Sequence, residues 1–571
     1  QDQVNLQYTL FITRTRFLGN KIVQSINENV GKDATGSNHR ERFIGLCGAP
    51  VTSYNGDKDA FLGRYHSYGN PVAVENGKCD NVLNYNANAC VALHSAITLQ
   101  PGETKVLTFV FGQANAVEAD AIMAPYNDAS QVEKELAELK NYWHSKLENF
   151  QVNTPDAAFN SMINTWNAYQ CFITFTWSRA ASFVYCGQRN GYGYRDTVQD
   201  IQGIIHLDPE MALSQIRFML SAQVNNGGGL PLVKYTHNPG HEDTPDDESY
   251  VRETGHPAYR ADDALWLFPT VWKYVAEPGN KAFINEVIPY ANKEEGTEYI
   301  AYLEKTQKEL GDIIEKECWE DDRYVRGIKE DGQVIGSKHD PEASMWLNPQ
   351  SWSVISGLAS REQAEKALES VHRELNTKFG VRLMTPSYVD HAFDGAQALL
   401  FNPSTKENGG IFSQPQGWII LAESLMGHGN RAFEYFTESS PASQNDNADV
   451  RRLEPYVHGQ FTESVESPFE GRSHVHWLTG TASTCMVGCV EGICGMRPDL
   501  NGLWVCPAIP SEWKEITMDK VFRGKKLHIT VKNPDGKEGG FKEFYLNGKK
   551  TDKPYVPADE MKDENEIILV M

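Results

Sequence analysis

Residues 158–177 read AFNSMINTWNAYQCFITFTW, one of seven helix-like segments, several of which are apolar almost all round. Helices of this kind are buried on more than one face, which indicates helices packed against helices. The other six, joined by long loops rich in Gly, Pro and aromatic residues, are Pro209–Asn225, Ala264–Val275, Tyr299–Lys316, Arg361–Leu375, Pro415–Met426 and Gly480–Cys494. Because no fixed-period repeat links them, we predict an α/α barrel with functional loops at one end rather than a solenoid.

Strand-like segments flank this helical region on both sides. Before it, Leu6–Thr13 and Lys105–Gly112 alternate apolar and polar residues. Val132–Phe150 then has apolar residues at helical spacing, which predicts an amphipathic connector. After the helical region, three runs predict a second β domain: Leu527–Val531, Phe541–Leu546 and Ile567–Val570.

We therefore expect a multidomain α+β protein. Its four parts are an N-terminal β-sandwich at residues 1–115, a helical linker at 116–154, a helical barrel at 155–495 and a C-terminal β domain at 496–571. A length of 571 residues fits this number of domains.

The composition favours a neutral small molecule as the ligand. The chain has 53 Lys and Arg against 76 Asp and Glu, a net charge of −23. Nucleic acids and anionic membranes reward basic patches, so neither is an expected partner. No run of about 18 apolar residues occurs, which excludes a transmembrane helix. No signal peptide opens the chain, and the cysteines are scattered, so we expect a cytoplasmic protein.

The sequence predicts no metal site. Cys485, Cys489 and Cys494 lie in an apolar helical run without His ligands and are interpreted as small buried hydrophobic residues. The loop histidines lack ligand spacing; they are His237, His241, His256, His474 and His476.

Two segments carry charged residues on candidate ligand loops. In Gly187–Asp200 (GQRNGYGYRDTVQD), adjacent Arg195 and Asp196 can hydrogen-bond the vicinal hydroxyls of a sugar or form a structural ion pair. In Arg252–Trp266, the neighbouring carboxylates of Asp262 and Asp263 can cap a helix or bind a ligand.

Two further segments suit a sugar or an anion at the start of a helix. Lys406–Trp418 (KENGGIFSQPQGW) places polar groups around a Gly pair, and ordinary helix capping is the alternative. In Trp477–Ser483 (WLTGTAS), Thr479 and Thr481 flank Gly480 and can form an anion cradle without net positive charge, or a simple N-cap. Aromatic residues are dense around all four segments, and sugars stack on such rings.

Taken together, these segments resemble the inverting disaccharide phosphorylases of the cellobiose and chitobiose phosphorylase family, glycoside hydrolase family 94. The motifs occur in the family's order along almost the whole chain. They are R-D-x-x-Q-D at Arg195–Asp200, D-D-x-x-W-L at Asp262–Leu267, K-E-N-x-G-I-F at Lys406–Phe412, L-E-P-Y at Leu453–Tyr456 and W-L-T-G-T-A at Trp477–Ala482. The resemblance implies a β-sandwich, a helical linker, an (α/α)6 barrel and a jelly-roll-like C-terminal β-sheet.

The resemblance also implies a reaction. An Asp general acid protonates the glycosidic oxygen of a β-linked gluco-disaccharide or oligosaccharide such as cellobiose, and inorganic phosphate attacks the anomeric carbon from the opposite face. The products are α-glucose 1-phosphate and a shortened sugar. No organic cofactor is needed, phosphate is the co-substrate, and a homodimer is expected.

Roles for individual residues follow from the same resemblance. Arg189 and Asp196 are expected to hold the non-reducing sugar, with Arg195 supporting their loop. Gln414, Thr479, Gly480 and Thr481 are expected to bind phosphate. Lys406, Glu407 and Gln397 are expected on the acceptor side.

The chain departs from the family pattern at three places. The W-N-D step that carries the general acid is absent, and a block of sequence is missing at the Thr297/Glu298 junction, so the catalytic Asp is unknown; the N-terminal sandwich is also shortened. Gln414 stands where relatives often have a phosphate-binding His. Gln397 and Phe401 replace a Glu and a Tyr on the acceptor side, so the acceptor need not be plain glucose.

Two other functions stay open. An (α/α)6 glycoside hydrolase would need a second carboxylate as base, for which Glu407 and Asp263 are candidates. A non-catalytic glycan-binding protein would have lost its acid altogether.

Overall fold

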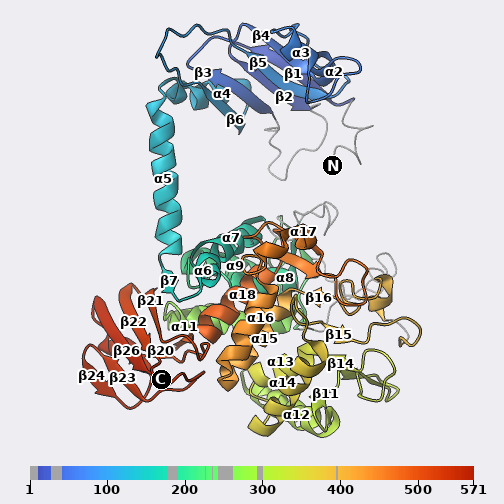
Figure 1. The fold of residues 1–571 in the computed structure, drawn as a ribbon, viewed down its shortest axis with the longest axis vertical. Coiled ribbons are helices and arrows are strands. Elements are labelled where there is room, and N and C mark those ends of the chain that lie inside the picture. Colours follow the sequence, from blue (N-terminus) through green and yellow to red (C-terminus); the bar gives the residue numbers. More distant parts are fainter. Residues whose placement is uncertain are drawn as a thin grey trace. The chain divides into compact units, whose positions relative to one another are not determined.

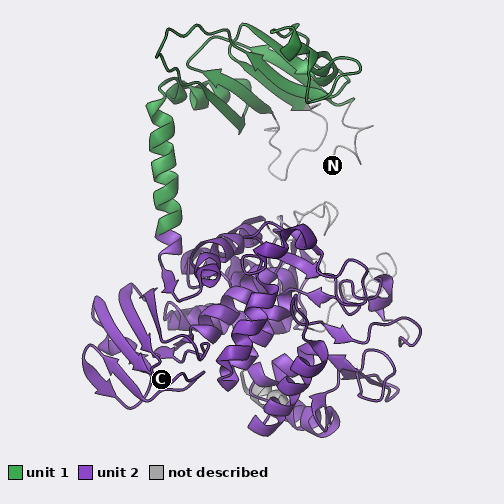
Figure 2. Ribbon diagram, viewed as in Figure 1, with its two compact units in different colours: residues 1–144 green, residues 145–571 purple. Residues whose placement is uncertain are grey.

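The computed structural model describes residues 11–26, 41–177, 191–225, 227–234, 236–241, 262–291, 300–393 and 396–571, with the backbone alone at 26, 300–307 and 397. These residues form two compact units, Gln1–His144 and Ser145–Met571 (Figure 2). Residues 6–10 of the predicted strand Leu6–Thr13 lie outside the described residues, and the first observed strand begins at Thr13.

The first unit is built on an antiparallel sheet. Its strands lie in the order β1-β2-β3-β6, with bounds Thr13–Leu18, Lys21–Ile26, Arg42–Cys47 and Thr108–Gln113. β4 (Ser53–Asp57) and β5 (Ala89–His94) form a separate pair beside the short helices α2 (Lys58–Leu62) and α3 (Val72–Glu75). The sheet packs on α4 (Ala116–Met123), where Val23, Phe43 and Met123 are buried together. The strand expected at Lys105–Gly112 is observed as β6.

The predicted connector is α5 (Ser130–Leu147), which ends three residues before the expected Phe150. Phe150 instead begins strand β7 (Phe150–Asn153), where Phe150 and Val152 are buried. β7 pairs antiparallel with β21 (Glu515–Phe522), far along the chain. Burial against this distant strand therefore overrides the local helical pattern after Leu147.

The second unit ends in a six-stranded sheet in the order β24-β23-β26-β22-β21-β7. Its other strands are β22 (Lys525–Lys532), β23 (Glu543–Leu546), β24 (Lys549–Thr551) and β26 (Glu564–Val570). Buried and exposed residues alternate along β21 and β22, as expected for a sheet with one covered face. The three predicted C-terminal strands are therefore observed in β22, β23 and β26. A smaller sheet contains β19 (Met496–Asp499), β20 (Gly502–Val505) and β25 (Tyr555–Pro557).

Between these strands the second unit is helical, as predicted (Figure 1). The stretch at 158–177 forms α6 (Ala157–Ser161), the π-helical turn η2 (Met162–Trp166) and α7 (Asn167–Trp177). The other predicted helices are observed as α9 (Pro209–Leu220), η4 (Ala264–Trp266) with α11 (Leu267–Ala276), α12 (Ile300–Glu317), α14 (Arg361–Leu375), α15 (Gln414–Met426), and α18 (Thr481–Val487) with η8 (Gly488–Ile493). Four further helices of the second unit were not predicted from the sequence: α8 (Tyr194–Ile201), α13 (Leu347–Ile355), α16 (Gly429–Ser439) and α17 (Ala448–Arg451).

Glycines bring α15 and α18 unusually close together. A methyl group at Gly417 of α15 would lie 2.1 Å from the carbonyl carbon of Thr484, and one at Gly488 would lie 2.5 Å from the carbonyl oxygen of Gly417. No side chain larger than hydrogen fits at either position. The N-terminal ends of these two helices carry two of the candidate site segments, so this contact fixes the segments relative to each other.

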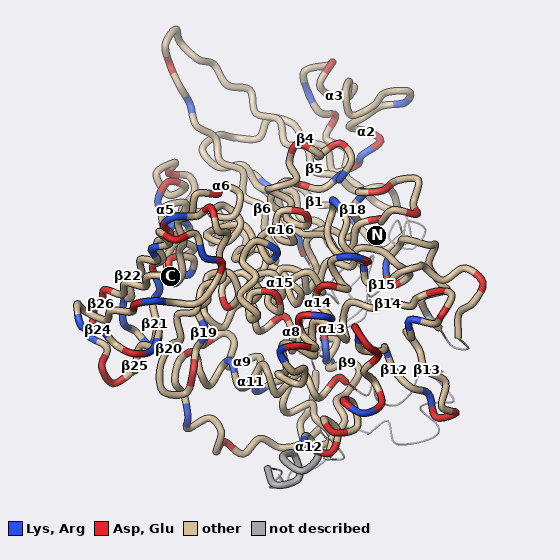
Figure 3. The backbone as a smooth tube through the Cα atoms, turned by 60° about the horizontal axis from the view of Figure 1, so that its bottom comes forward, with Lys and Arg blue, Asp and Glu red and all other residues tan. Residues whose placement is uncertain are grey.

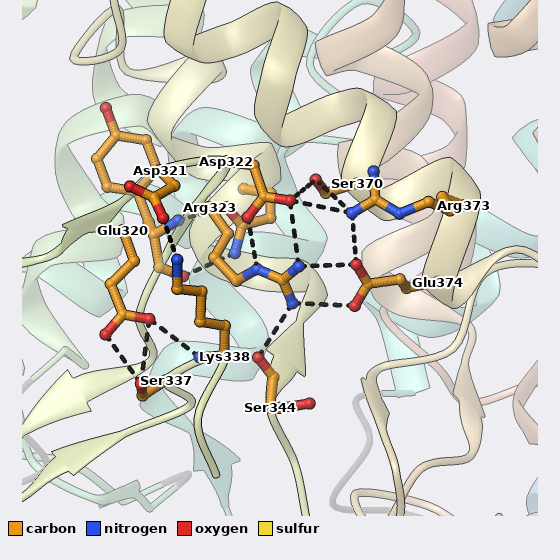
Figure 4. Close-up of polar contacts among 12 residues, drawn as sticks. Glu320, Asp321, Asp322, Arg323, Ser337, Lys338, Ser344, Ser370, Arg373 and Glu374 are labelled. Atoms are coloured by element: carbon orange, nitrogen blue, oxygen red, sulfur yellow. Dashed lines mark hydrogen bonds and ion pairs between the residues drawn. The ribbon is translucent and has the colours of Figure 1, made fainter.

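An ion-pair network holds the short strands β10 (Trp319–Glu320) and β11 (Arg323–Tyr324) against α14 (Figure 4). The buried Arg323 guanidinium donates to both carboxylate oxygens of Glu374, at 2.9 and 2.7 Å, and to Asp322 at 2.9 Å. Burial raises the pKa of Asp322, but hydrogen bonds from Arg323, Ser370 and Arg373 outweigh burial and lower it to about 2. Burial likewise raises the pKa of Glu374, and its arginine partners lower it overall.

Replacing Glu374 with Gln is expected to lower the free energy of unfolding by about 2–3 kcal/mol at pH 7, because the buried Arg323 loses a bidentate partner. The folded-state pKa of Glu374 lies below its usual 4.5, so the folded state binds fewer protons than the unfolded state. The difference between parent and variant is therefore full above about pH 5 and shrinks as the pH falls below 4.5. Urea unfolding across this pH range measures it.

The exposed Glu362 of the same helix is the matched control. It pairs with Lys366 at 2.8 Å across one helical turn. Glu362→Gln is expected to leave the free energy of unfolding almost unchanged, because an exposed ion pair contributes little to stability. Equal losses in the two variants would contradict the role given to the Arg323 network.

Basic and acidic positions are interspersed along the described chain (Figure 3). None of the described helices is long and apolar enough to cross a membrane.

Candidate active site

Arg195 and Asp196 lie in the first turn of α8, and Arg195 forms an ion pair with the Asp262 side chain. Its Nη1 donates to Asp262 Oδ1 at 3.0 Å and to Oδ2 at 2.9 Å, and Trp266 Nε1 donates to the same carboxylate at 3.2 Å. Burial raises the pKa of Asp262, but Arg195 and Trp266 outweigh it and lower the pKa. The Arg195 ion pair thus joins the segment Gly187–Asp200 to the segment Arg252–Trp266. The Asp262 side chain supports Arg195 instead of capping a helix.

Asp263 is fully buried, and its Oδ1 lies 3.9 Å from Arg195 Nε. It stands at the N-cap position of η4 but makes no side-chain capping hydrogen bond there. Arg195 therefore contacts both carboxylates of the pair. The neighbouring Asp196, which is the acidic residue of the R-D motif, is half-buried on α8.

Gln414 begins α15 and faces Gln199 of α8. Its Nε2 donates to Gln199 Oε1, and both side chains are buried. The main chain of the same two residues is tied to α18, because Ser483 Oγ donates to the Gln199 carbonyl at 2.9 Å and Thr484 Oγ1 to the Gln414 carbonyl at 2.7 Å. Three helices that are far apart in sequence therefore meet at Gln414.

Thr479, Gly480 and Thr481 form the entry to α18 beside this meeting point. The Thr479 and Thr481 hydroxyls are 2.8 Å apart, and Thr479 Oγ1 also accepts the Thr481 backbone N–H at 3.2 Å. Thr481 Oγ1 donates to the Gly459 carbonyl of strand β17 (Gly459–Thr462) at 3.2 Å. Both hydroxyls are buried, and the bond between them joins the two threonines that flank Gly480.

The loop at residues 404–410, called the Lys406 loop below, is connected to Thr479, Gly480 and Thr481 through a small sheet. The loop leads into β16 (Ile411–Phe412), which pairs with β17 and so with the Gly459 carbonyl beside Thr481. Lys406 is half-buried with its Nζ 4.9 Å from the centre of the Phe401 ring, while Glu407 is exposed. Asn408 is buried and structural: its side chain accepts from the Tyr388 N–H at 2.7 Å and donates to the Tyr388 and Phe401 carbonyls at 3.0 Å.

The aromatic residues near the site are only partly available for stacking. Trp266 stacks on Trp418 with ring centres 5.4 Å apart and planes at 15°, and Trp352 meets both rings edge-on. One face of Trp266 and one of Trp418 are therefore covered by the other ring. The free cysteines Cys485, Cys489 and Cys494 are buried, as predicted.

The histidines of these loops have local partners. His474 Nε2 lies 2.7 Å from Glu463 Oε1, and His476 Nδ1 lies 3.1 Å from Glu454 Oε2. His237 Nε2 lies 3.0 Å from the Ser221 carbonyl. Across the described part of the chain, no group of three His, Cys, Asp or Glu residues could hold a metal ion.

Three residues named in the sequence analysis have no described side chain. Arg189 and His256 lie outside the described residues, and Gln397 is described by its backbone alone, at the start of η6 (Gln397–Leu400). An ion pair between Arg382 and Glu466 also contacts the Lys406 loop, and it was not predicted from the sequence. These two residues are 84 positions apart and belong to no recognised motif, so no local pattern could have paired them.

Comparison with known families identifies the family of the chain. The catalytic-domain model of the glycosyl hydrolase 94 superfamily matches residues 142–303 and 298–495, and the family's supersandwich-domain model matches residues 1–129. The chain therefore belongs to the glycosyl hydrolase 94 family, with an N-terminal supersandwich domain followed by a catalytic domain, and the predicted family is confirmed.

Several of its relatives are phosphorylases. N,N'-diacetylchitobiose phosphorylase of Vibrio furnissii is 31% identical, over 91% of this chain and 74% of that protein. Solabiose phosphorylase of Paenibacillus borealis is 25% identical, over 89% and 72%. Cellobionic acid phosphorylase of Neurospora crassa is 24% identical, over 92% and 72%. The expected enzyme class, a glycosyltransferase-type phosphorylase, is thereby confirmed.

The comparisons also bear on the missing block. The catalytic-domain match is divided into two segments that meet at residues 298–303, beside the predicted Thr297/Glu298 junction. The alignment with the Vibrio furnissii enzyme extends over 597 positions, more than the 571 residues of this chain. That relative therefore contains residues that have no counterpart here.

Proposed function

We propose that the protein catalyses the reversible, inverting phosphorolysis of a β-linked disaccharide to an α-sugar 1-phosphate and a free sugar. The observation that carries the proposal is the meeting of α8, α15 and α18 around Gln414 and the Thr479–Thr481 hydroxyl pair. Within the fold, we propose that the helices of the second unit belong to an (α/α)6 barrel followed by a jelly-roll-like β domain. The domain limits proposed are residues 1–115, 116–154, 155–495 and 496–571.

In this proposal, phosphate binds to Thr479, Gly480, Thr481 and Gln414. Phosphate is already an anion, so it attacks the anomeric carbon without a general base. Four neutral groups supply hydrogen bonds and no charge, so affinity for phosphate depends on their number and alignment. The shared contacts of α15 and α18 support such alignment, because they hold Gln414 and Thr481 on helices that cannot slide past each other.

The sugar ring to be transferred is proposed to bind beside α8, with Asp196 and Arg189 accepting and donating to its hydroxyls. Arg195 is a supporting residue in this arrangement, because Asp262 occupies its guanidinium. Lys406, Glu407 and Gln397 are proposed for the acceptor sugar. The family resemblance implies a Tyr where this chain has Phe401. The Phe401 ring, which lies under Lys406, supports a different contact with the acceptor sugar.

We propose that the general acid belongs to a segment that relatives carry at the Thr297/Glu298 junction. An apolar groove of about 1150 Å³ lies beside α9 and α11 and is lined by Leu220, Phe268, Trp272 and Tyr290. Phe268 and Trp272 are 47% and 52% exposed, one helical turn apart on α11, which is typical of a face that another helix covers. The Ala291 N–H donates to the carbonyl of Gln223, which lines the groove, at 2.8 Å, so the last described residue before the junction lies beside this groove.

A hydrolase is the alternative, and the geometry disfavours one of its two candidate bases. Hydrolysis with inversion needs a carboxylate base that touches water. Of the two candidates, Asp263 is fully buried against Arg195, and Glu407 lies exposed on the Lys406 loop. By resemblance we further propose a homodimer in the cytoplasm, with phosphate as co-substrate and no organic cofactor.

Release of sugar from cellobiose or N,N'-diacetylchitobiose is expected to depend strictly on inorganic phosphate, with an α-sugar 1-phosphate as product. The assay compares the two disaccharides with and without phosphate. Intact mass is measured on the same sample, because a protein of 64.1 kDa lacks the acid segment and is expected to bind sugar without turnover. Sugar release without phosphate would show a hydrolase instead.

A further inference from the structure

The carboxylate of Glu466 gathers three donors beneath the Lys406 loop. Its Oε2 accepts from Ser387 Oγ at 2.6 Å, from Arg382 Nη2 at 2.5 Å and from Ser404 Oγ. The backbone of Glu466 joins the same cluster, because its N–H donates to Ser404 Oγ at 3.0 Å. One side chain thus links three separate segments of the chain.

The three donors of the cluster are buried, whereas the Glu466 side chain is 35% exposed. Arg382, Ser387 and Ser404 are 5%, 4% and 0% exposed. Burial raises the pKa of Glu466, but the three donors outweigh burial and lower it, so the carboxylate is ionised at neutral pH. The ion pair between the buried Arg382 and the partly exposed Glu466 adds little net stability, so its value lies in the geometry that it imposes.

That geometry is imposed on the backbone of the Lys406 loop. Arg382 Nε donates to the Gly409 carbonyl at 3.1 Å, and Ser387 Oγ donates to the Asn408 carbonyl at 3.1 Å. Ser404 and Lys406 have positive φ values of 62° and 48°, which side-chain-bearing residues adopt only when the surroundings enforce them. The packing is tight, since a methyl group at Gly409 would lie 2.0 Å from Ser387 Oγ.

We propose that Glu466 and Arg382 are positioning residues, which set the place of Lys406 for the acceptor sugar from beneath its loop. The inference rests on the proposed function, because it assigns the loop to the acceptor side. Neither residue needs to touch substrate. Their effect on sugar binding passes through the backbone of residues 404–409.

Hydrogen exchange tests the positioning without any ligand. In Glu466→Gln, amides of the Lys406 loop are expected to exchange at least tenfold faster than in the parent, while amides of α14 keep their rates. Ser387→Ala, which leaves the ion pair in place, is expected to give a smaller acceleration in the same loop. Parent-like exchange at residues 404–410 in both variants would overturn the proposal.

Calorimetric titration with glucose and with N-acetylglucosamine, in the presence of phosphate, tests the link to the acceptor. Glu466→Gln is expected to raise the Kd of the sugar that binds the parent at least tenfold. Glu470→Gln is the matched control, since Glu470 lies on the same segment and pairs with the exposed Lys378 at 3.3 Å. Its loop exchange and its Kd are expected to match the parent.

The two measurements distinguish a failure of this inference from a failure of the proposed function. Faster loop exchange with an unchanged Kd overturns the acceptor link proposed for Glu466 and leaves phosphorolysis standing. A parent protein that binds neither sugar overturns the acceptor assignment itself, while the exchange data still report what Glu466 does to the loop.

Discussion

Replacing Asp196 with Asn is expected to lower kcat/KM for phosphorolysis about a thousandfold, or roughly 4 kcal/mol of transition-state stabilisation. The reason is the proposed contact between the Asp196 carboxylate and two hydroxyls of the transferred sugar. Hydrogen bonds to a charged group contribute about 1.5–3 kcal/mol each, and those to the sugar ring strengthen as positive charge develops at the anomeric carbon. Steady-state kinetics on the enzyme that turns over its disaccharide measures the loss.

The alternative role for Asp196 is purely local, as an acidic residue in the first turn of α8. In that case the variant would lose only about 0.3–1 kcal/mol of stability and keep its activity. Glu210→Gln is the control, because Glu210 is also an acidic residue in the first turn of its helix, α9, and is exposed. Similar kinetics in the two variants would remove Asp196 from the sugar site.

Replacing Thr481 with Val is expected to raise the Kd of inorganic phosphate by roughly 10- to 100-fold, the equivalent of about 1.5–3 kcal/mol. The substitution keeps the shape of the side chain and removes the hydroxyl that faces Thr479 at 2.8 Å. Since the proposed cradle supplies no positive charge of its own, each hydroxyl carries a large share of the binding. Calorimetric titration of phosphate into the 571-residue chain measures the change without requiring turnover.

Thr462→Val is the matched control for this experiment. Its hydroxyl is also buried and lies 2.8 Å from Ser473 Oγ, between β17 and strand β18 (Ser473–His476). Both substitutions remove one buried hydroxyl, so a general loss of stability would appear in both. A phosphate Kd that stays at the parent value in Thr481→Val, or that rises equally in Thr462→Val, would remove Thr481 from the phosphate site.

Much of the helical part of the fold could be predicted from the sequence. Periodic apolar residues and clear end signals located α14 at Arg361–Leu375, where Ser360 and Gln363 form a capping box. The end of α5 could not be predicted correctly. The helical spacing of apolar residues continues to Phe150, but Phe150 begins a strand in the structure. Only a strand more than three hundred residues away explains the difference.

The candidate site shows the same division. Its four segments were recognisable, because each combines glycines with polar residues at a helix start. The partner that each side chain contacts could not be predicted. That Asp262 pairs with Arg195, that Gln414 faces Gln199, and that Glu466 lies beneath the Lys406 loop are facts of tertiary contact, which no spacing within one segment encodes.

The pairing of β7 with β21 has a consequence for synthesis of the chain. Asn153 leaves the ribosome about 360 residues before Glu515, so at about 5–20 residues per second its partner strand arrives roughly 20–70 s later. Until then β7 is an unpaired edge that carries the buried side chains of Phe150 and Val152. During this interval the β7 segment exists without the five other strands of its sheet, all of which are translated after it.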